Sequence, residues 1–212
     1  QEAPRGQLRL TCSYSLADAF LVSAANDYLR RWPGTAIDIL LVDRTVNLIE
    51  ERIDLALRIS NELDPNLVAR RLGTCRSVVC ATPAYLERFG TPQQVQDLAH
   101  HNCLTYSYFG KSLWTFDGPL GPESVPVSGN FSGNISNLLL SATLQDCGIS
   151  LQPRYSVASL LERGELVALL PAWEPQTMGI HGVYATRKQM SPLLRSFLDF
   201  LLARMAQDPL WQ

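Results

Sequence analysis

Two segments in the first half of the chain end in residues that could bind a small anion. Gly6-Gln-Leu-Arg-Leu-Thr-Cys-Ser13 and Asp54-Leu-Ala-Leu-Arg-Ile-Ser60 each read as a strand that passes from apolar residues into hydroxyl or basic side chains. In open α/β sheets, ligands bind just beyond the carboxyl ends of such strands. Hydroxyl groups supply donors there, and the Arg58 guanidinium can pair with a carboxylate through two hydrogen bonds. The pattern indicates a site that binds a small molecule rather than one that transforms it.

The sequence offers little for catalysis. His100-His101 is the one conspicuous histidine pair, and no serine, cysteine or carboxylate motif accompanies it. We find no glycine-rich phosphate loop and no HExxH motif. Cys75 and Cys80, the closest of the five cysteines, have no histidine at metal-binding spacing. We therefore expect no enzyme activity, no catalytic residue, no metal and no cofactor.

The composition of the chain argues against nucleic acids and membranes as its partners. The 212 residues carry a net charge of −2 and show no basic stripe of the kind that nucleic-acid binders present. No apolar run approaches the roughly 18 residues of a membrane span. The odd number of cysteines argues against a disulfide framework and favours a reducing compartment. We expect a cytoplasmic protein that binds neither DNA nor a membrane through this chain.

Apolar periodicity in the first part of the chain predicts the order βαβαβ, which implies a parallel sheet with right-handed crossovers. The expected strands cover 7–12, 37–42 and 55–59, and the expected helices cover 16–31 and 45–52. Ser13 or Ser15 is the expected N-cap of the first helix, and Pro33-Gly34 ends it.

Short elements alternate along the rest of the chain. The expected strands cover 67–72, 77–81, 103–108, 125–131, 149–151, 166–170 and 180–185, with a hairpin within 109–124. The expected helices cover 84–89, a short segment ending near His100, 134–145, 155–163 and 193–205. Thr82-Pro83 and Ser191-Pro192 have the pattern of an N-cap followed by proline at the first helical position. The sequence shows no floppy spacer, so we expect any crossing between two lobes to lie within strands.

Several short motifs, taken in order, resemble the effector-binding domain of LysR-type transcriptional regulators. They are Pro4-Arg-Gly6-Gln-Leu-Arg-Leu10, Asp54-Leu-Ala-Leu-Arg58, Ala81-Thr-Pro-Ala-Tyr-Leu86, Gly90-Thr-Pro92, Asp97-Leu-Ala-His-His-Asn-Cys-Leu104, Gly148-Ile-Ser-Leu-Gln-Pro153, Gly164-Glu-Leu-Val167 and Ser196-Phe-Leu-Asp-Phe200. The resemblance implies an α/β, two-lobed fold of the type 2 periplasmic-binding-protein kind, with two crossover hinge strands and an inducer in the cleft.

The resemblance also implies how the chain is divided. Lobe I covers 7–80 plus 184–212, lobe II covers 81–183, and 1–6 is the remnant of a linker. Whole members of the family begin with a winged helix-turn-helix, which this sequence does not contain. The chain therefore resembles a regulatory domain without its DNA-binding part.

Carried over to this sequence, the family pattern implies a set of effector-binding residues. They are Ser13, Tyr14, Ser15, Arg58, Ser60, Thr82, Tyr106, Gly133, Asn134, Gln152 and Pro153. Helix N-termini at Ser15 and Asn134 would offer N–H donors to an anionic or strongly polar metabolite. The alternatives are simple capping by Ser13, Ser15 and Asn134, a surface ion pair of Arg58 with Asp54 or Glu62, and a core position for Tyr106.

The same resemblance implies self-association. Phe20, Tyr28, Ile39 and Leu41 of one copy would meet Leu139 and Thr143 of another, giving a homodimer and, for the full-length protein, a tetramer. An effector would then act on DNA binding by rearranging this assembly. A secreted solute-binding protein of the same fold is the alternative function, and a signal peptide encoded upstream would favour it.

Overall fold

The computed structural model describes residues 2–42, 46–106, 111–186 and 190–212 and divides the chain into two compact units. Unit 1 comprises Gln1–Cys75 and Met178–Gln212, and unit 2 comprises Arg76–Thr177. The chain passes from one unit to the other after residues 75 and 177, a few residues before the expected boundaries at 80 and 183. Within the described residues, every helix is too short or too polar to cross a membrane.

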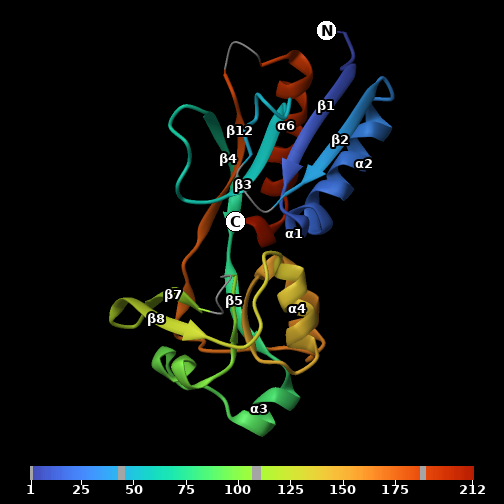
Figure 1. Ribbon diagram of the computed structural model, residues 1–212. Helices are drawn as coiled ribbons and strands as arrows, with labels where there is room; N and C mark the ends of the chain where they lie inside the picture. Colours follow the sequence, from blue (N-terminus) through green and yellow to red (C-terminus); the bar gives the residue numbers. More distant parts are fainter. Residues whose placement is uncertain (1, 43–45, 107–110, 187–189) are drawn as a thin grey trace. The chain divides into compact units, whose positions relative to one another are not determined.

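Unit 1 is built on a five-stranded sheet of order β2-β1-β3-β12-β4 (Figure 1). The strands are β1 (Gly6–Cys12), β2 (Thr35–Leu41), β3 (Leu55–Ile59), β4 (Val68–Cys75) and β12 (Met178–Tyr184). β1 runs parallel to β2 and β3, as expected, whereas β12 runs antiparallel to both β3 and β4. The carboxyl ends of β1 and β3 therefore meet at one edge of the sheet.

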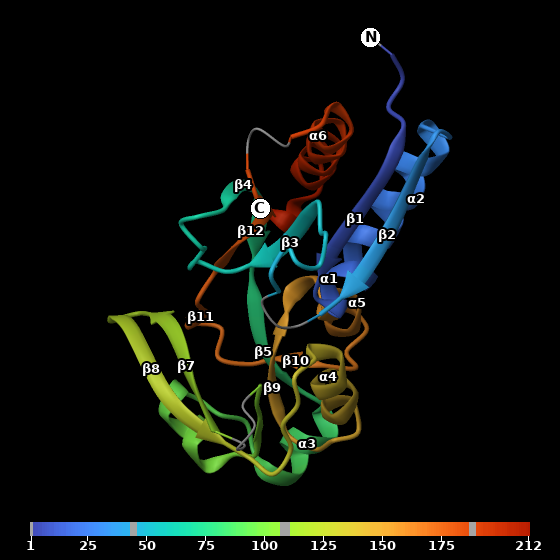
Figure 2. The ribbon, with the colours of Figure 1, turned by 45° about the horizontal axis from the view of Figure 1, so that its top comes forward.

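Helices cover one face of this sheet. They are α1 (Tyr14–Leu16), the π-helical turn η1 (Ala17–Leu21), α2 (Val22–Arg31), α6 (Pro192–Ala206) and the 3₁₀ turn η4 (Pro209–Trp211). Aromatic rings pack edge to face between these helices: the ring centroids of Tyr28 on α2 and Phe197 on α6 lie 5.1 Å apart, and those of Phe20 on η1 and Trp211 on η4 lie 5.2 Å apart. Figure 2 shows α2 beside β1 and β2. Phe20 and Tyr28 are thus buried in the core of unit 1 and present no surface to a second copy.

The expected helix over 45–52 is wrong for the described residues, which form turns between β2 and β3. Asn47 Oδ1 accepts hydrogen bonds from the main-chain N–H groups of Ile49 and Glu50, and this local pairing competes with helix propagation. Arg52 then adopts a left-handed backbone with φ of 54°. Val46 and Ile53 are buried as expected, but Ile49 is exposed.

Unit 2 contains two further sheets, of order β10-β5-β9-β6 and β11-β7-β8. Its strands are β5 (Ser77–Ala81), β6 (Cys103–Leu104), β7 (Lys111–Gly118), β8 (Gly121–Ser128), β9 (Ile149–Pro153), β10 (Val167–Ala168) and β11 (Glu174–Pro175). Its helices are α3 (Pro83–Phe89), the 3₁₀ helix η2 (Val95–His100), α4 (Ser136–Leu144) and α5 (Arg154–Glu162). The expected hairpin is present as β7 and β8, joined at Pro119-Leu120. Of the strand expected over 103–108, Cys103–Leu104 form β6, and residues 107–108 lie outside the described residues. The strand expected over 166–170 is reduced to Val167–Ala168.

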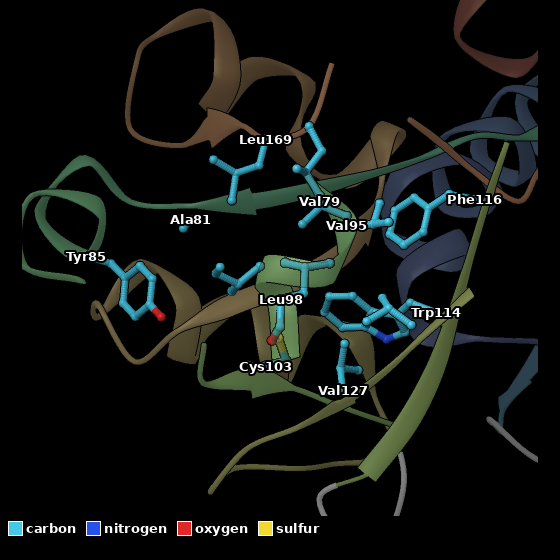
Figure 3. Close-up of a cluster of buried hydrophobic side chains, with 13 residues drawn as sticks. Val79, Ala81, Tyr85, Val95, Leu98, Cys103, Trp114, Phe116, Val127 and Leu169 are labelled. Atoms are coloured by element: carbon cyan, nitrogen blue, oxygen red, sulfur yellow. The ribbon is translucent and has the colours of Figure 1, made fainter. Parts of the chain in front are cut away.

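The core of unit 2 joins the two sheets. Figure 3 shows Val79 and Ala81 of β5, Trp114 and Phe116 of β7, and Leu98 of η2 among its buried side chains. Tyr85 of α3 closes one side of this cluster. Burial of alternate residues on β7 and β8 holds the hairpin against the 3₁₀ helix, so the polar faces of these strands point away from the core.

Candidate ligand-binding site

An open pocket of about 290 Å³ lies in unit 1 where β1 and β3 end. Its lining residues come from these two strand ends, from the turns before β3 and from the segment after it. They are Thr11, Cys12, Ser13, Val42, Val46, Ala56, Leu57, Arg58, Ile59, Ser60 and Glu62. Because β1 and β3 run parallel, residues at their carboxyl ends share this edge, as the sequence pattern predicts. The structure thus brings Ser13, Arg58 and Ser60 to a single pocket.

Arg58 is the basic residue of the pocket. It is partly exposed, and its Nη2 donates a hydrogen bond to the Val46 carbonyl at 3.3 Å. Among the described residues, Arg58 has no carboxylate within 4 Å, so the expected alternative of a surface ion pair with Asp54 or Glu62 is not present. Asp54 instead accepts a hydrogen bond from the Arg9 main chain. The guanidinium therefore keeps donors for an anion.

The three adjacent residues after β1 differ in their position relative to the pocket. They are Ser13, Tyr14 and Ser15. Ser13 is the N-cap residue of α1 by its extended backbone, but its side chain makes no capping hydrogen bond. The Ser13 and Ser15 hydroxyl oxygens lie 3.4 Å apart. Ser15 is buried and Tyr14 is exposed, and neither lines the pocket. Of the three predicted residues, Ser13 is the one that faces it.

Two hydroxyl groups of the pocket behave differently. Ser60 Oγ donates to the Glu62 carbonyl at 2.7 Å and accepts from the Glu62 N–H at 3.0 Å, so it is held in a local turn. Thr11 Oγ1 is buried and, within the described part of the chain, has no hydrogen-bond partner. Sequence reasoning missed Thr11, because a threonine inside a strand is an ordinary strand residue. Its unpartnered hydroxyl is a second candidate donor beside Arg58.

In unit 2, a buried polar cluster links β9 to α4. Gln152 Nε2 donates to the Ser136 carbonyl at 3.2 Å and to Ser150 Oγ at 3.3 Å. Thr143 Oγ1 lies 2.8 Å from Ser150 Oγ. Gln152 Oε1 is buried and has no partner among the described residues. Thr143 and Leu139, both expected at a dimer interface, lie inside unit 2.

Four other predicted residues lie near the starts of α4 and α5 or along a neighbouring segment. The Gly133 N–H donates to the Thr105 carbonyl at 3.1 Å, which places Gly133 beside the strand end that carries the exposed Tyr106. Asn134 is exposed and does not cap α4, because the helix begins two residues later, after Ile135. Tyr106 is exposed rather than part of the core. Pro153 ends β9 and is partly buried at the start of α5.

Thr82 is separated from these residues. It follows β5, whose antiparallel pairing sets Val78, not Ala81, opposite Gln152. Thr82 Oγ1 accepts a hydrogen bond from the Tyr85 N–H at 3.2 Å and donates to Asp146 Oδ1 at 2.6 Å. The side chain is buried and serves as the N-cap of α3. Its hydrogen bonds are those of a helix cap, not of an open ligand site.

Most of the cysteines are buried. All five are free thiols, and four of them are buried. Burial raises the pKa of both Cys80 and Cys103 to about 12, so both stay protonated and poorly nucleophilic. Among the described residues, no group of histidine, cysteine and acidic side chains has the arrangement of a metal site.

Comparisons with known proteins agree with this architecture. The family model of the LysR substrate binding domain matches residues 1–206. The transcriptional activator TtdR of Escherichia coli is 31% identical over 94% of this chain, which spans 65% of TtdR's length. The LysR-type regulator CrgA of Neisseria meningitidis superposes with a TM-score of 0.84, at 30% identity, over 95% of this chain and 69% of CrgA. Vibrio cholerae AphB, a virulence activator, superposes with a TM-score of 0.83, at 24% identity, over 95% of this chain and 69% of AphB.

Proposed function

Because this chain belongs to the family of LysR substrate-binding domains, we propose that it binds a small, polar, anionic effector at the unit 1 pocket. The fold of the family is the two-lobed, periplasmic-binding-protein-like fold, and its relatives are named as transcriptional regulators rather than enzymes. The effector is thus bound without chemical change.

The observation that carries the proposal is the environment of the Arg58 guanidinium in the pocket. Its guanidinium lines a pocket of about 290 Å³, has no carboxylate partner among the described residues, and lies with the Ser13 and Thr11 hydroxyls at the same strand ends. A carboxylate or similar oxyanion would accept charge-assisted hydrogen bonds from it. The effector-binding residues that the family pattern implies in unit 2, such as Gln152 and Tyr106, stay predictions.

This chain spans 65% of the length of the curated relative TtdR. We propose that it acts in the cytoplasm as part of a longer regulator that carries a helix-turn-helix domain. A ligand can shift a conformational equilibrium only by binding one state more tightly than the other. On this proposal, effector binding changes the arrangement of a homodimer or tetramer and so the binding of DNA.

The test begins with a panel of small mono- and dicarboxylates screened by thermal shift, since a ligand of the native state alone raises apparent stability. For a carboxylate that binds, Arg58→Gln should weaken binding by about 1.5–3 kcal/mol, about ten- to hundredfold in Kd by calorimetry. Glu62→Gln should tighten it, because Glu62 is the one acidic residue among the described residues that line the pocket. Arg88→Gln, on the exposed face of α3 in unit 2, is the control. Equal affinity of the Arg58 variant and the unsubstituted chain would remove Arg58 from the site.

A further inference from the structure

Three basic residues form a row across neighbouring strands of unit 1. His181 of β12 pairs with Arg58 of β3 on one side and with Arg71 of β4 on the other. Residues opposite each other in antiparallel strands place their side chains on the same face of the sheet. Arg58, His181 and Arg71 therefore share one face, and Arg58 at one end of the row lines the pocket described above.

Two members of this basic row converge above Gly179. Gly179 precedes His181 by two residues, so it faces the same side of β12. A methyl group at Gly179 would stand within 3.0 Å of both the His181 ring and the Arg71 guanidinium. The His181 and Arg71 side chains therefore both lie close to the main chain at Gly179, which has no side chain of its own. Arg71 also donates from Nη2 to Thr74 Oγ1 at 3.0 Å, which fixes its orientation.

The segment after β3 borders the row. The Ser60 N–H donates to the Gly179 carbonyl at 3.1 Å, and Asn61 Oδ1 accepts from the Gly179 N–H at 3.1 Å. His181 therefore faces Arg58 from β3, Arg71 from β4 and the segment from Ser60 to Glu62. Glu62 is the only acidic group of that segment, and it lines the pocket at the Arg58 end.

The row lacks compensating negative charge. Within the described residues, none of its three members forms an ion pair within 4.0 Å. Like charges directly opposite each other across strands are destabilising, so the sheet carries an electrostatic cost at this place whenever His181 is protonated. Burial, together with the nearby Arg71, lowers the pKa of His181 below its ordinary value, although a hydrogen bond with the Ser60 main chain acts in the opposite direction. An anion over the row would remove the repulsion and favour the protonated imidazole.

We propose that Arg71 and His181 extend the Arg58 pocket into a continuous oxyanion-binding row, whose affinity for an anion rises as His181 takes up a proton from solvent. The inference deepens the proposed function and rests on it, because the Arg58 end of the row is the proposed effector site. It assigns His181 as the residue that couples effector binding to pH, and Arg71 as the second cation that positions the anion.

The probe is inorganic sulfate, whose charge stays constant over the range in which histidine titrates. The chain has three histidines, so imidazole resonances can be followed individually by NMR, with His181→Gln providing the assignment. Saturating sulfate should raise the titration midpoint of His181 but not that of His100, which lies in unit 2. Arg71→Gln should raise the midpoint in the sulfate-free protein, because it removes a neighbouring positive charge. A His181 midpoint that sulfate leaves unchanged overturns the proposal.

Calorimetry supplies the second measurement. Sulfate should bind at least about threefold more tightly at about pH 5.5 than at about pH 8, and each unit of rise in the His181 pKa can contribute up to about tenfold. His181→Gln and His181→Asn should each lose the part of this pH dependence that His100→Gln retains. Denaturant unfolding checks that the variants are folded.

The outcomes separate the two proposals. One outcome is that Arg58→Gln abolishes sulfate binding while both His181 variants keep the full pH dependence. In that case anion binding at the Arg58 pocket is supported, and the role of His181 is overturned. If sulfate fails to bind, or Arg58→Gln binds it unchanged at both pH values, the row does not bind oxyanions. Failure of sulfate alone leaves the carboxylate test of the proposed function to decide separately.

Discussion

At the scale of single residues, the hydrogen-bond partners of a polar side chain determine whether it is available as a donor to a ligand. Ser60 and Thr11 both line the unit 1 pocket, but Ser60 is engaged by Glu62 whereas Thr11 has no partner among the described residues. The family resemblance implies that Thr143 lies at a dimer interface, yet its hydroxyl contacts Ser150 inside unit 2. Residue type therefore identifies a donor, and only its neighbours show whether it is available.

Thr143→Val tests the buried cluster. The substitution keeps the shape of the side chain and removes the hydroxyl, leaving Ser150 with one polar partner fewer. We expect the free energy of unfolding to fall by about 1–3 kcal/mol, the cost of an unsatisfied buried polar group. Urea unfolding measures it, and Ser141→Ala on the exposed face of α4 is the control. A loss no larger than that of the control would show that the cluster is not stabilising.

The pKa values of two histidines predict how the free energy of unfolding depends on pH. Burial is the main cause that lowers the pKa of both His101 and His181 below 6.5. The unfolded chain then binds protons more readily than the folded one, so stability is complete above about pH 6.5 and declines as pH falls through that value. Urea midpoints between about pH 8 and about pH 5 should therefore decrease. The double variant His101→Gln, His181→Gln should show a shallower decrease, and an equal slope would contradict this assignment.

At the scale of elements, local hydrogen bonds set where helices begin. Thr82 and Ser191 accept hydrogen bonds from the N–H groups three residues ahead, and both helices start with proline as the sequence predicts. Asn47 shows the opposite effect, because its side chain stabilises a turn where apolar spacing predicts a helix. Capping motifs are readable in sequence since donor and acceptor lie within one turn.

Substitutions of Thr82 distinguish a role in capping α3 from a role in ligand binding. Thr82→Ala removes the cap of α3 and the hydrogen bond to Asp146, and should lower the free energy of unfolding by about 0.5–2 kcal/mol. Thr82→Ser should retain most of the stability. Both variants should bind the carboxylate found for the unit 1 pocket with unchanged affinity by calorimetry. A selective loss of affinity in a stable Thr82→Ser variant would return Thr82 to the ligand site.

At the scale of the whole molecule, each unit has its own core, and unit 1 is completed by a distant part of the chain. β12 and α6 join unit 1 after the chain has formed unit 2. β2 is an edge strand of the unit 1 sheet, paired only with β1. Of the six residues expected at a dimer interface, Ile39 and Leu41 of this strand present surface. An exposed edge strand with apolar residues favours pairing with a second chain.

Leu41→Asp tests this prediction of self-association. Leu41 is 42% exposed at the end of β2, so the substitution leaves the core intact while placing a charge on the proposed interface. We expect a shift from dimer toward monomer in sedimentation velocity. Leu120→Asp, at the 94% exposed turn between β7 and β8, makes the same chemical change elsewhere and should leave the assembly unchanged. Equal sedimentation of the two variants would exclude the β2 edge as the interface.

The sequence by itself determined the elements and the strand ends at which polar residues gather. Periodicity, prolines and caps are local, so the strands β1, β3 and β12 and the helices α3 and α6 were predictable, as was the convergence of Ser13 and Arg58 at one sheet edge. Tertiary structure alone decided burial and register. It placed Tyr28 and Thr143 in cores, left Thr11 without a described partner, and set His181 between Arg58 and Arg71. These outcomes depend on contacts between segments more than a hundred residues apart in some cases, whose pairing no local pattern specifies.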